Sequence, residues 1–370
     1  LASLAAFAMP LSAVAQEGAD DDETIEEVIA TGTRSAKPRS ASDSPVPIDA
    51  INADEFNSLG SSADLTDNLR ALVPSYTATP ATGDGSAFVR PTSLRGTAPD
   101  QTLVLVNGKR RHRSSLVQFF APAAGNGAHG VDIGMIPGIA LKRVEVLRDG
   151  AASQYGSDAI AGVINFILKD ADEGGEVMVQ AGEHFDGESS FKIAANGGIR
   201  LGDSGWANVS IEHIDNDALS RGIQRTSDEA RLLGDGVPLS QIGADSPFGD
   251  SPFLQTWGRP ETSGTRFFLN SGFAINNSAE LYARFSLADT EGRYRFFYRN
   301  ENHSPTLVGY RAQGYTGLPA GFTPYLDGDQ DDSSFVVGLQ GEFDNGMLYD
   351  VSYNYGKNEL DDFLNDTVNG

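Results

Sequence analysis

The chain has 370 residues, of which 39% are hydrophobic and 21% charged, with 42 glycines and no cysteine. This length can hold two or three domains, and the composition is that of a folded chain. Acidic residues outnumber basic ones by 51 to 27, so the net charge of −24 argues against binding to nucleic acid. The lack of cysteine excludes disulfides and thiolate metal ligands within these residues.

Residues 1–15 form an apolar, alanine-rich stretch that ends in Ala13-Val14-Ala15 before Gln16. An apolar stretch followed by a small-x-small sequence predicts a signal peptide and its cleavage site. The basic n-region is missing, so we interpret residues 1–15 as a signal peptide truncated at its start. The alternative is a buried helix of the mature protein. No apolar run of eighteen residues follows, so a membrane role would require β-strands.

Residues 16–40 are predicted to be a flexible segment that contains one short β-prone patch at 25–32. The residues of this patch are Ile25, Glu26, Glu27, Val28, Ile29, Ala30, Thr31 and Gly32. An extended apolar segment between two polar ones suits β-augmentation, in which main-chain hydrogen bonds add it to the sheet edge of another protein. The alternative is an ordinary edge strand of the next domain.

Residues 41–170 have the mixed pattern of a compact α+β domain. The predicted elements are a strand at 46–51, helices that begin near Asn52 and Ser62, strands at 103–106 and 139–147, a short helix at 151–161 and a strand at 163–168. The pair Asn107-Gly108 directly after an apolar run predicts a tight hairpin.

Residues 171–370 contain segments of about ten residues in which apolar and polar side chains alternate. Ala207, Val209 and Ile211, for example, oppose Asn208, Ser210 and Glu212. Tight connections alternate with long polar ones at about 215–263 and 300–333, as in an outer-membrane β-barrel with periplasmic turns and extracellular loops. The first connection, at 185–189, departs from this pattern, because it is short where a long loop is expected. A soluble β-sandwich is the alternative. About seven strands are predicted, so we expect an incomplete antiparallel transmembrane barrel, the N-terminal part of a longer gene product.

Five motifs occur in a fixed order, at 26–32, 88–96, 103–110, 136–151 and 155–165. In this order they resemble the TonB-dependent outer-membrane receptor family, by motif over residues 24–170 and by architecture over the rest. The residues that match the family's plug motifs are Leu94, Gly96, Asn107, Gly108, Arg143, Glu145, Asp149, Gly150, Tyr155, Gly156, Gly162 and Asn165.

The resemblance implies a plug domain inside a 22-stranded barrel, and it implies that residues 25–32 are the TonB box. The expected partners are the C-terminal domain of TonB with its inner-membrane energising complex, outer-membrane lipid and a small extracellular ligand. The expected location is the outer membrane of a Gram-negative bacterium, with plug and box accessible from the periplasm. Arg95 and Arg148 match positions where the family places plug arginines that face acidic groups on the barrel wall.

The expected function is TonB-dependent active transport of a scarce solute, with a ferric siderophore as the first choice. Cobalamin, an oligosaccharide or a peptide are alternatives, and a passive porin or adhesion barrel is the rival class. We expect no enzymatic activity, no cofactor and no metal site. The acidic run 327–332 has the carboxylate spacing of a calcium loop but lacks the required following glutamate, so we interpret it as an acidic surface loop.

Overall fold

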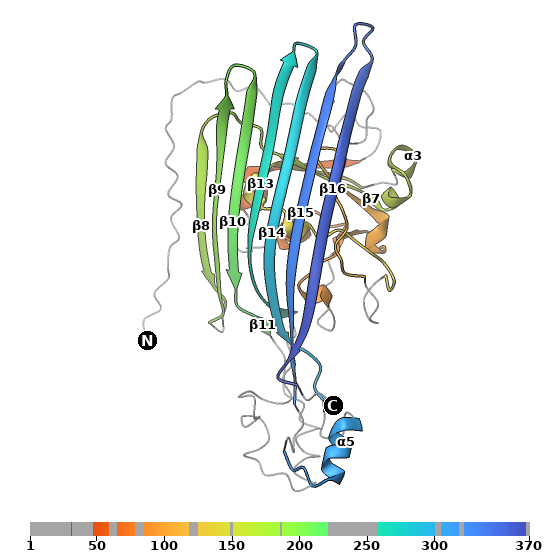
Figure 1. Cartoon of the computed structure of the whole chain (residues 1–370), viewed down its shortest axis with the longest axis vertical. Coiled ribbons are helices and arrows are strands. Elements are labelled where there is room, and N and C mark those ends of the chain that lie inside the picture. Colours follow the sequence, from red (N-terminus) through yellow and green to blue (C-terminus); the bar gives the residue numbers. More distant parts are fainter. Residues whose placement is uncertain are drawn as a thin grey trace.

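The computed structural model describes residues 31, 47–58, 65–77, 85–117, 125–148, 151–185, 187–220, 258–299, 305–317 and 322–367. Two parts stand out in Figure 1: a small mixed domain, and a tall sheet of long strands that lies along one side of it. Over these residues no helix has the length and hydropathy needed to cross a membrane. We call the mixed domain the plug and the seven-stranded sheet the wall.

The plug is built on a five-stranded sheet in the order β1-β6-β7-β4-β5. Its elements are β1 (Ile48–Asn52), α1 (Ala53–Ser58), α2 (Leu65–Leu72), β2 (Tyr76–Thr77), β3 (Ser93–Leu94), β4 (Thr102–Val106), β5 (Lys109–Arg110), β6 (Leu141–Leu147), α3 (Ala152–Tyr155) and β7 (Gly162–Leu168). β4 runs parallel to β7, and the other neighbours are antiparallel. Because both sheet faces are covered, β4 and β7 are almost wholly apolar.

The plug core joins the sheet to the helices and also includes one residue of the wall. Phe56 and Leu69 of the two helices pack with Val144 and Phe166 of the sheet, and Phe268 of the wall belongs to the same buried cluster. Asn52 begins α1 as the sequence predicts, since its Oδ1 accepts a hydrogen bond from the Glu55 amide at 2.8 Å. The plug core therefore extends to the inner face of the wall at Phe268.

Two glycine positions decide local details of the plug. The predicted hairpin turn is present. Asn107 has φ of 45° and Gly108 has φ of 76°, and a two-residue type I′ turn requires positive φ at both positions. The prediction of one helix over residues 151–161 is wrong. Gly156, with φ of 95°, ends α3 after four residues, and a 3₁₀ turn at Ser157–Ala159 follows. The strand predicted from residue 139 begins at Leu141, after a 3₁₀ turn at Gly138–Ala140.

The wall is an antiparallel sheet in the order β16-β15-β14-β13-β10-β9-β8. Its strands are β8 (Gly175–Glu183), β9 (Ser189–Leu201), β10 (Gly205–Asn216), β13 (Glu261–Asn276), β14 (Ala279–Arg295), β15 (Tyr325–Glu342) and β16 (Leu348–Asn365). The short pair β11 (Leu219–Ser220) and β12 (Gly258–Arg259) and the helix α5 (Pro305–Ala312) lie in its long connections. The sheet is open, so the predicted count of seven strands and the incomplete barrel are confirmed for the described residues.

The strands extend further than the sequence pattern predicts. The acidic run 327–332 lies inside β15, so its interpretation as a surface loop is wrong. Asp327, Asp329 and Asp331 pair in register with Arg293, Glu291 and Asp289 of β14, and their side chains point away from the plug. Successive side chains of a strand point to opposite faces of the sheet. Gln330 and Asp332 of the same run therefore point inward, where they are buried against the plug.

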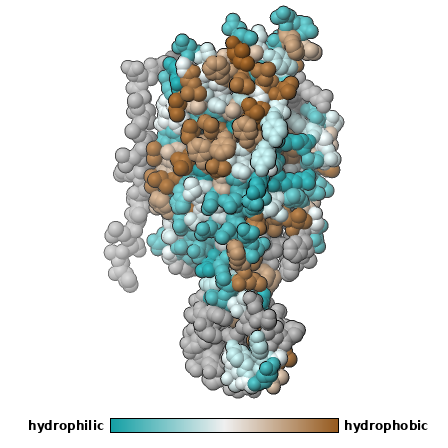
Figure 2. All heavy atoms as spheres, in the orientation of Figure 1, coloured by the Kyte–Doolittle hydropathy of each residue, from teal (hydrophilic) through white to brown (hydrophobic). Residues whose placement is uncertain are grey.

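The two faces of the wall have opposite chemistry. Exposed apolar residues such as Val177, Ile211, Leu281, Val351 and Tyr353 point outward. Figure 2 shows a hydrophobic area over the upper half of the sheet. The buried inward face is polar, with Asn208, Ser210, Glu212, Asn270 and Ser286. An apolar outer face with a polar inner face is typical of a membrane barrel and contradicts a soluble sandwich.

The connections orient the wall. The tight turns at 202–204, 277–278 and 343–347 lie at one end, which is the top in Figure 1. The long connections leave from the other end, where the short connection between β8 and β9 also lies. In outer-membrane barrels tight turns face the periplasm and long loops face the medium. The top of Figure 1 is therefore the periplasmic end.

Candidate functional site: the Thr31 pocket and the plug–wall network

Thr31, the seventh residue of the predicted TonB box, is buried against the plug sheet with 1% of its surface exposed. Its amide donates a hydrogen bond to Oε2 of Glu145 at 2.9 Å, and its hydroxyl donates to the same oxygen. Nδ2 of Asn165 donates to Oγ1 of Thr31 at 2.9 Å. Glu145 on β6 and Asn165 on β7 are register partners in the sheet, which places both side chains beside Thr31.

Glu145 is fully buried, and its charge is balanced by Arg143 two residues earlier on the same face of β6. Nε of Arg143 donates to Oε1 of Glu145 at 2.7 Å, so Oε2 is left to accept from Thr31. A buried carboxylate is tolerated only when it is paired and hydrogen-bonded. Thr31 thus adds two hydrogen bonds to a charge buried inside the plug.

Asn165 also connects Thr31 to the turn of the β4–β5 hairpin. Its Oδ1 accepts from the Gly108 amide at 3.0 Å. Asn107 in turn accepts from the Leu168 amide at 2.8 Å, and its Nδ2 lies 3.4 Å from Oδ1 of Asn270 on the wall. Nη1 of Arg284 on β14 donates to the carbonyl of Asn107 at 3.3 Å. A continuous chain of polar contacts therefore runs from Thr31 to the wall.

A cavity of about 660 Å³ lies between this part of the plug and the wall. Its plug side includes Thr31, Asn107, Arg143, Tyr155 and Asn165. Its wall side includes the inward-facing residues Trp206, Asn270, Glu280, Tyr282, Arg284 and Gln340. Trp206, Glu280 and Gln340 lie near the tight turns, so the cavity is at the periplasmic end.

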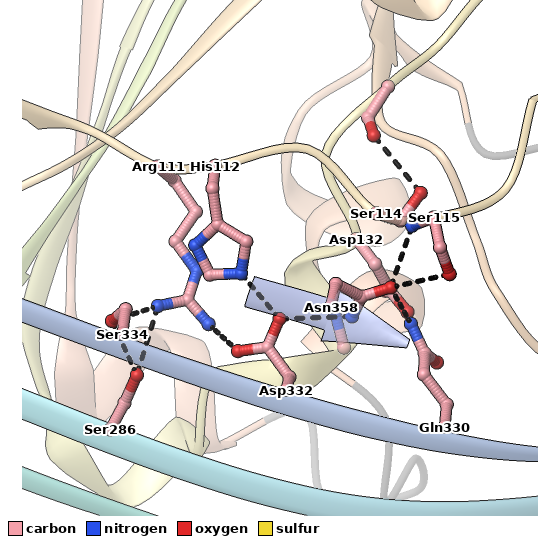
Figure 3. A network of polar contacts seen from close by, with 12 residues as sticks. Arg111, His112, Ser114, Ser115, Asp132, Ser286, Gln330, Asp332, Ser334 and Asn358 are labelled. Carbon is pink, nitrogen blue, oxygen red and sulfur yellow. Dashed lines mark hydrogen bonds and ion pairs between the residues drawn. The ribbon is translucent and has the colours of Figure 1, made fainter. Parts of the chain in front are cut away.

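A second network, shown in Figure 3, joins the plug segment after the hairpin to the wall. Arg111 and Asp332 form an ion pair in which both side chains are only 4% exposed. Nη1 of Arg111 also donates to Oγ of Ser286 at 3.0 Å and to Oγ of Ser334 at 2.6 Å. Burial lowers the pKa of Arg111 from its usual value and the charge of Asp332 opposes that shift. A guanidinium stays charged in this setting.

His112 and Ser115 extend this network to β16. Nε2 of His112 is 2.7 Å from Oδ2 of Asp332, and Nδ2 of Asn358 donates to the same oxygen at 3.0 Å. Oδ1 of Asn358 accepts from the Ser115 amide at 2.7 Å. A side chain at Gly356 would overlap the His112 ring, so this glycine makes the space that the plug histidine fills. Residues 111–115 are thus anchored to β14, β15 and β16.

Sequence reasoning missed this anchor. The sequence predicts that Asp332 lies in an acidic surface loop, where it would not contact the plug. One sequence feature indicates such an anchor: Arg110, Arg111 and Arg113 form a basic cluster in an acidic chain, and buried arginines require acidic partners. The partner could not be found without knowing that β15 extends through residue 332 and that its even-numbered residues face inward.

The two predicted plug arginines lie together but outside these networks. Nη1 of Arg95 donates to the backbone carbonyl of Arg148 at 3.1 Å, and Arg148 forms an ion pair with Asp49 of β1 at 2.8 Å. Both arginines are exposed. Their contact with acidic groups of the barrel wall stays a prediction.

The remaining predicted motif residues have structural roles or lie outside the described residues. Leu94 is fully buried, Gly96 has φ of 68°, and the backbone carbonyl of Tyr155 accepts a hydrogen bond from Nη2 of Arg110. Gly162, with φ of 146°, leaves no room for a side chain against Leu147 and Leu94. Asp149, Gly150 and the box residues 25–30 and 32 lie outside the described residues.

At the end with the long connections, one plug aromatic is inserted into the wall. Phe88 lies over Gly292 and Gly328, where any side chain would overlap its ring, and 6.1 Å from the ring of Tyr294. Glycines on two neighbouring wall strands therefore leave the space that the Phe88 ring of the plug fills. Across the described ranges, no cluster of three or more histidine, aspartate or glutamate side chains has the geometry to hold a metal ion.

Fold and contacts together define a plug-type membrane receptor, in which a small domain is held by polar contacts against a wall of membrane strands. Residues 40–163 match the family of the TonB-dependent Receptor Plug Domain. The chain is 25% identical over 310 residues to the vitamin B12 transporter BtuB of Photobacterium profundum, and the match covers 80% of this chain and 47% of that protein. It is 40% identical over 118 residues to BtuB of Vibrio cholerae, covering 32% of this chain and 17% of that one.

A solved structure with the same fold is a mutant ferric enterobactin receptor, PfeA, from Pseudomonas aeruginosa in complex with enterobactin. It aligns with a TM-score of 0.55 at 20% identity, over 84% of this chain and 41% of that one. The chain spans less than half the length of each of these proteins. Residues 40–163 therefore belong to the TonB-dependent receptor plug domains, the chain resembles a TonB-dependent outer-membrane receptor over 80% of its length, and its location is the outer membrane of a Gram-negative bacterium.

Proposed function

We propose that the receptor formed with this chain imports a scarce solute across the outer membrane and that TonB powers the import by pulling on residues 25–32. The burial of Thr31 on Glu145 and Asn165 supports the proposal, because it ties the predicted TonB box to the plug interior. The outer membrane has no nucleotide supply, so energy has to come through a partner that spans the periplasm. We assign residues 1–15 to a signal peptide, 16–40 to a flexible segment, 41–170 to the plug and 171–370 to the barrel.

Deletion of residues 25–32 tests this function. We expect the deletion to abolish uptake in cells that produce the receptor and to leave solute binding at the surface unchanged. Deletion of residues 17–24, which precede the box, is the matched control and should leave uptake intact. Uptake that survives loss of 25–32 would assign the protein to the passive porins or adhesion barrels instead.

We propose a ferric siderophore as the solute, with cobalamin as the second candidate. The fold is shared with a receptor solved with enterobactin, whereas the named sequence relatives are vitamin B12 transporters. Binding of a panel of ferric siderophores and of cyanocobalamin to the purified receptor, followed by tryptophan fluorescence, decides between them. Saturable binding of cobalamin alone would reject the siderophore assignment.

A further inference from the structure

The outward face of the wall carries a groove of about 500 Å³ where its apolar band ends. The groove crosses the four strands β13, β14, β15 and β16. Leu287, on its floor, lies eight residues from Ala279, the periplasmic end of β14. At about 3.4 Å per residue and a strand tilt of ~40°, this is roughly 21 Å of depth, close to the ~25 Å height of the apolar band of an outer-membrane barrel. The groove therefore lies at the extracellular edge of the membrane.

Strand register places the side chains of the groove in two rows at successive depths. The row on the membrane side consists of register partners across the four strands, namely Phe267, Leu287, Ser333 and Lys357. The next row lies two residues further toward the medium on each strand and consists of Thr265, Asp289, Asp331 and Glu359. Two residues of a strand span about 7 Å. Within this distance the groove changes from an apolar floor beside one ammonium to a line of carboxylates.

The carboxylate row carries more negative charge than the groove balances. Asp289, Asp331 and Glu359 are opposite one another on three neighbouring strands, and like charges in opposite positions destabilise a sheet. Among the described residues that line the groove, Lys357 is the only basic one, and its Nζ is 2.6 Å from Oε2 of Glu359. Asp332 also borders the groove, but its side chain pairs inward with Arg111. A cation bound beside Asp331 would therefore stabilise this row.

The order of chemical groups along the groove matches a phosphoethanolamine headgroup. In such a lipid the acyl chains lie deepest, the phosphate follows, and the primary ammonium lies two carbon atoms further out. Phe267 and Leu287 provide apolar contact for a chain, Lys357 can donate to the phosphate, and Asp331 can accept from the ammonium. Hydrogen bonds between ionised groups of this kind are stronger than neutral ones. The groove thus complements the headgroup at each depth.

We propose that this groove binds one molecule of phosphatidylethanolamine, with its phosphate on Lys357 and its ammonium on Asp331. The volume of about 500 Å³ is within the range of sites for small molecules, and the apolar floor continues into the membrane face of the wall. Figure 2 shows this change from hydrophobic surface above to hydrophilic surface below. The bound lipid fixes the depth of the wall in the membrane and takes no part in solute import.

Binding of three dioctanoyl lipids to the purified, delipidated receptor tests the headgroup, with native mass spectrometry as the measurement. The lipids differ only in carrying ethanolamine, choline or glycerol on the phosphate. We expect the ethanolamine lipid to bind about fivefold more tightly than the other two, because choline has no N–H to donate and glycerol has no charge. Equal affinities for ethanolamine and choline would overturn the proposal. Tighter binding of a lipid A that lacks an amine would also overturn it.

Three single variants test the place of binding. Lys357→Gln removes the phosphate partner and should weaken the binding of all three lipids. Asp331→Asn removes the ammonium partner and should abolish the preference for ethanolamine over choline without weakening the binding of the choline lipid. Asp361→Asn, on the same face of β16 but outside the groove, is the matched control and should keep the preference. All three side chains are exposed, so the fold is preserved in each variant. An unchanged preference in Asp331→Asn, or an equal loss in Asp361→Asn, would contradict a lipid site in this groove.

Discussion

Replacement of Arg111 by methionine removes one member of the buried pair and leaves Asp332 inside the plug–wall interface. Breaking a buried pair on one side costs about 3–5 kcal/mol. Asp332 retains His112 at 2.7 Å and Asn358 at 3.0 Å, so we expect the lower end, about 3 kcal/mol. A loss of about 3 kcal/mol corresponds to roughly a 10²-fold change in an opening equilibrium.

Hydrogen exchange at the Ser115 amide reports this opening, because that amide donates to Asn358 within the same network. We expect Arg111→Met to speed its exchange roughly 10²-fold, and Arg111→Met combined with Asp332→Leu to restore most of the protection, since two apolar side chains can replace a buried pair. The amide of Val146, in the centre of the plug sheet, is the internal control. A change below tenfold in the single variant, or no recovery in the double variant, would refute the reasoning.

Three further predictions concern single positions. Thr31→Ala removes the hydroxyl contacts to Glu145 and Asn165, worth about 1 kcal/mol or more, and should raise the affinity of the TonB C-terminal domain about fivefold in a titration, whereas Thr31→Ser should not. Gly356→Ala displaces the His112 ring, which should cost about 1–3 kcal/mol of stability and speed hydrogen exchange at the Ser115 amide. Gly309→Ala meets open space and should leave that exchange unchanged. Unchanged exchange in Gly356→Ala would show that His112 can shift freely. Val351→Arg, on the outward apolar band, should destabilise the barrel in lipid vesicles by about 2–4 kcal/mol in urea titrations, and Asp361→Arg beyond that band should not; equal effects would place the membrane boundary elsewhere.

Much of the plug was predictable because its signals are local. Two consecutive residues with positive φ require a pair such as Asn107-Gly108, and a buried strand requires an apolar run such as 103–106. The polar residues Glu145 and Asn165 were recognised from the motif order, but their joint contact with Thr31 was not, because it links positions more than one hundred residues apart. Strand ends were the weakest part, as the acidic run in β15 shows.

The sequence by itself determined the two-part organisation, the hairpin turn, the seven wall strands and the alternation of their faces, since each depends on neighbours along the chain. Only the tertiary structure decided which residues hold the plug. Arg111 meets Asp332 because one lies just after a hairpin and the other points inward from a strand 221 residues later. The register of β14, β15 and β16 sets that meeting, and register is a property of paired strands that no single segment carries.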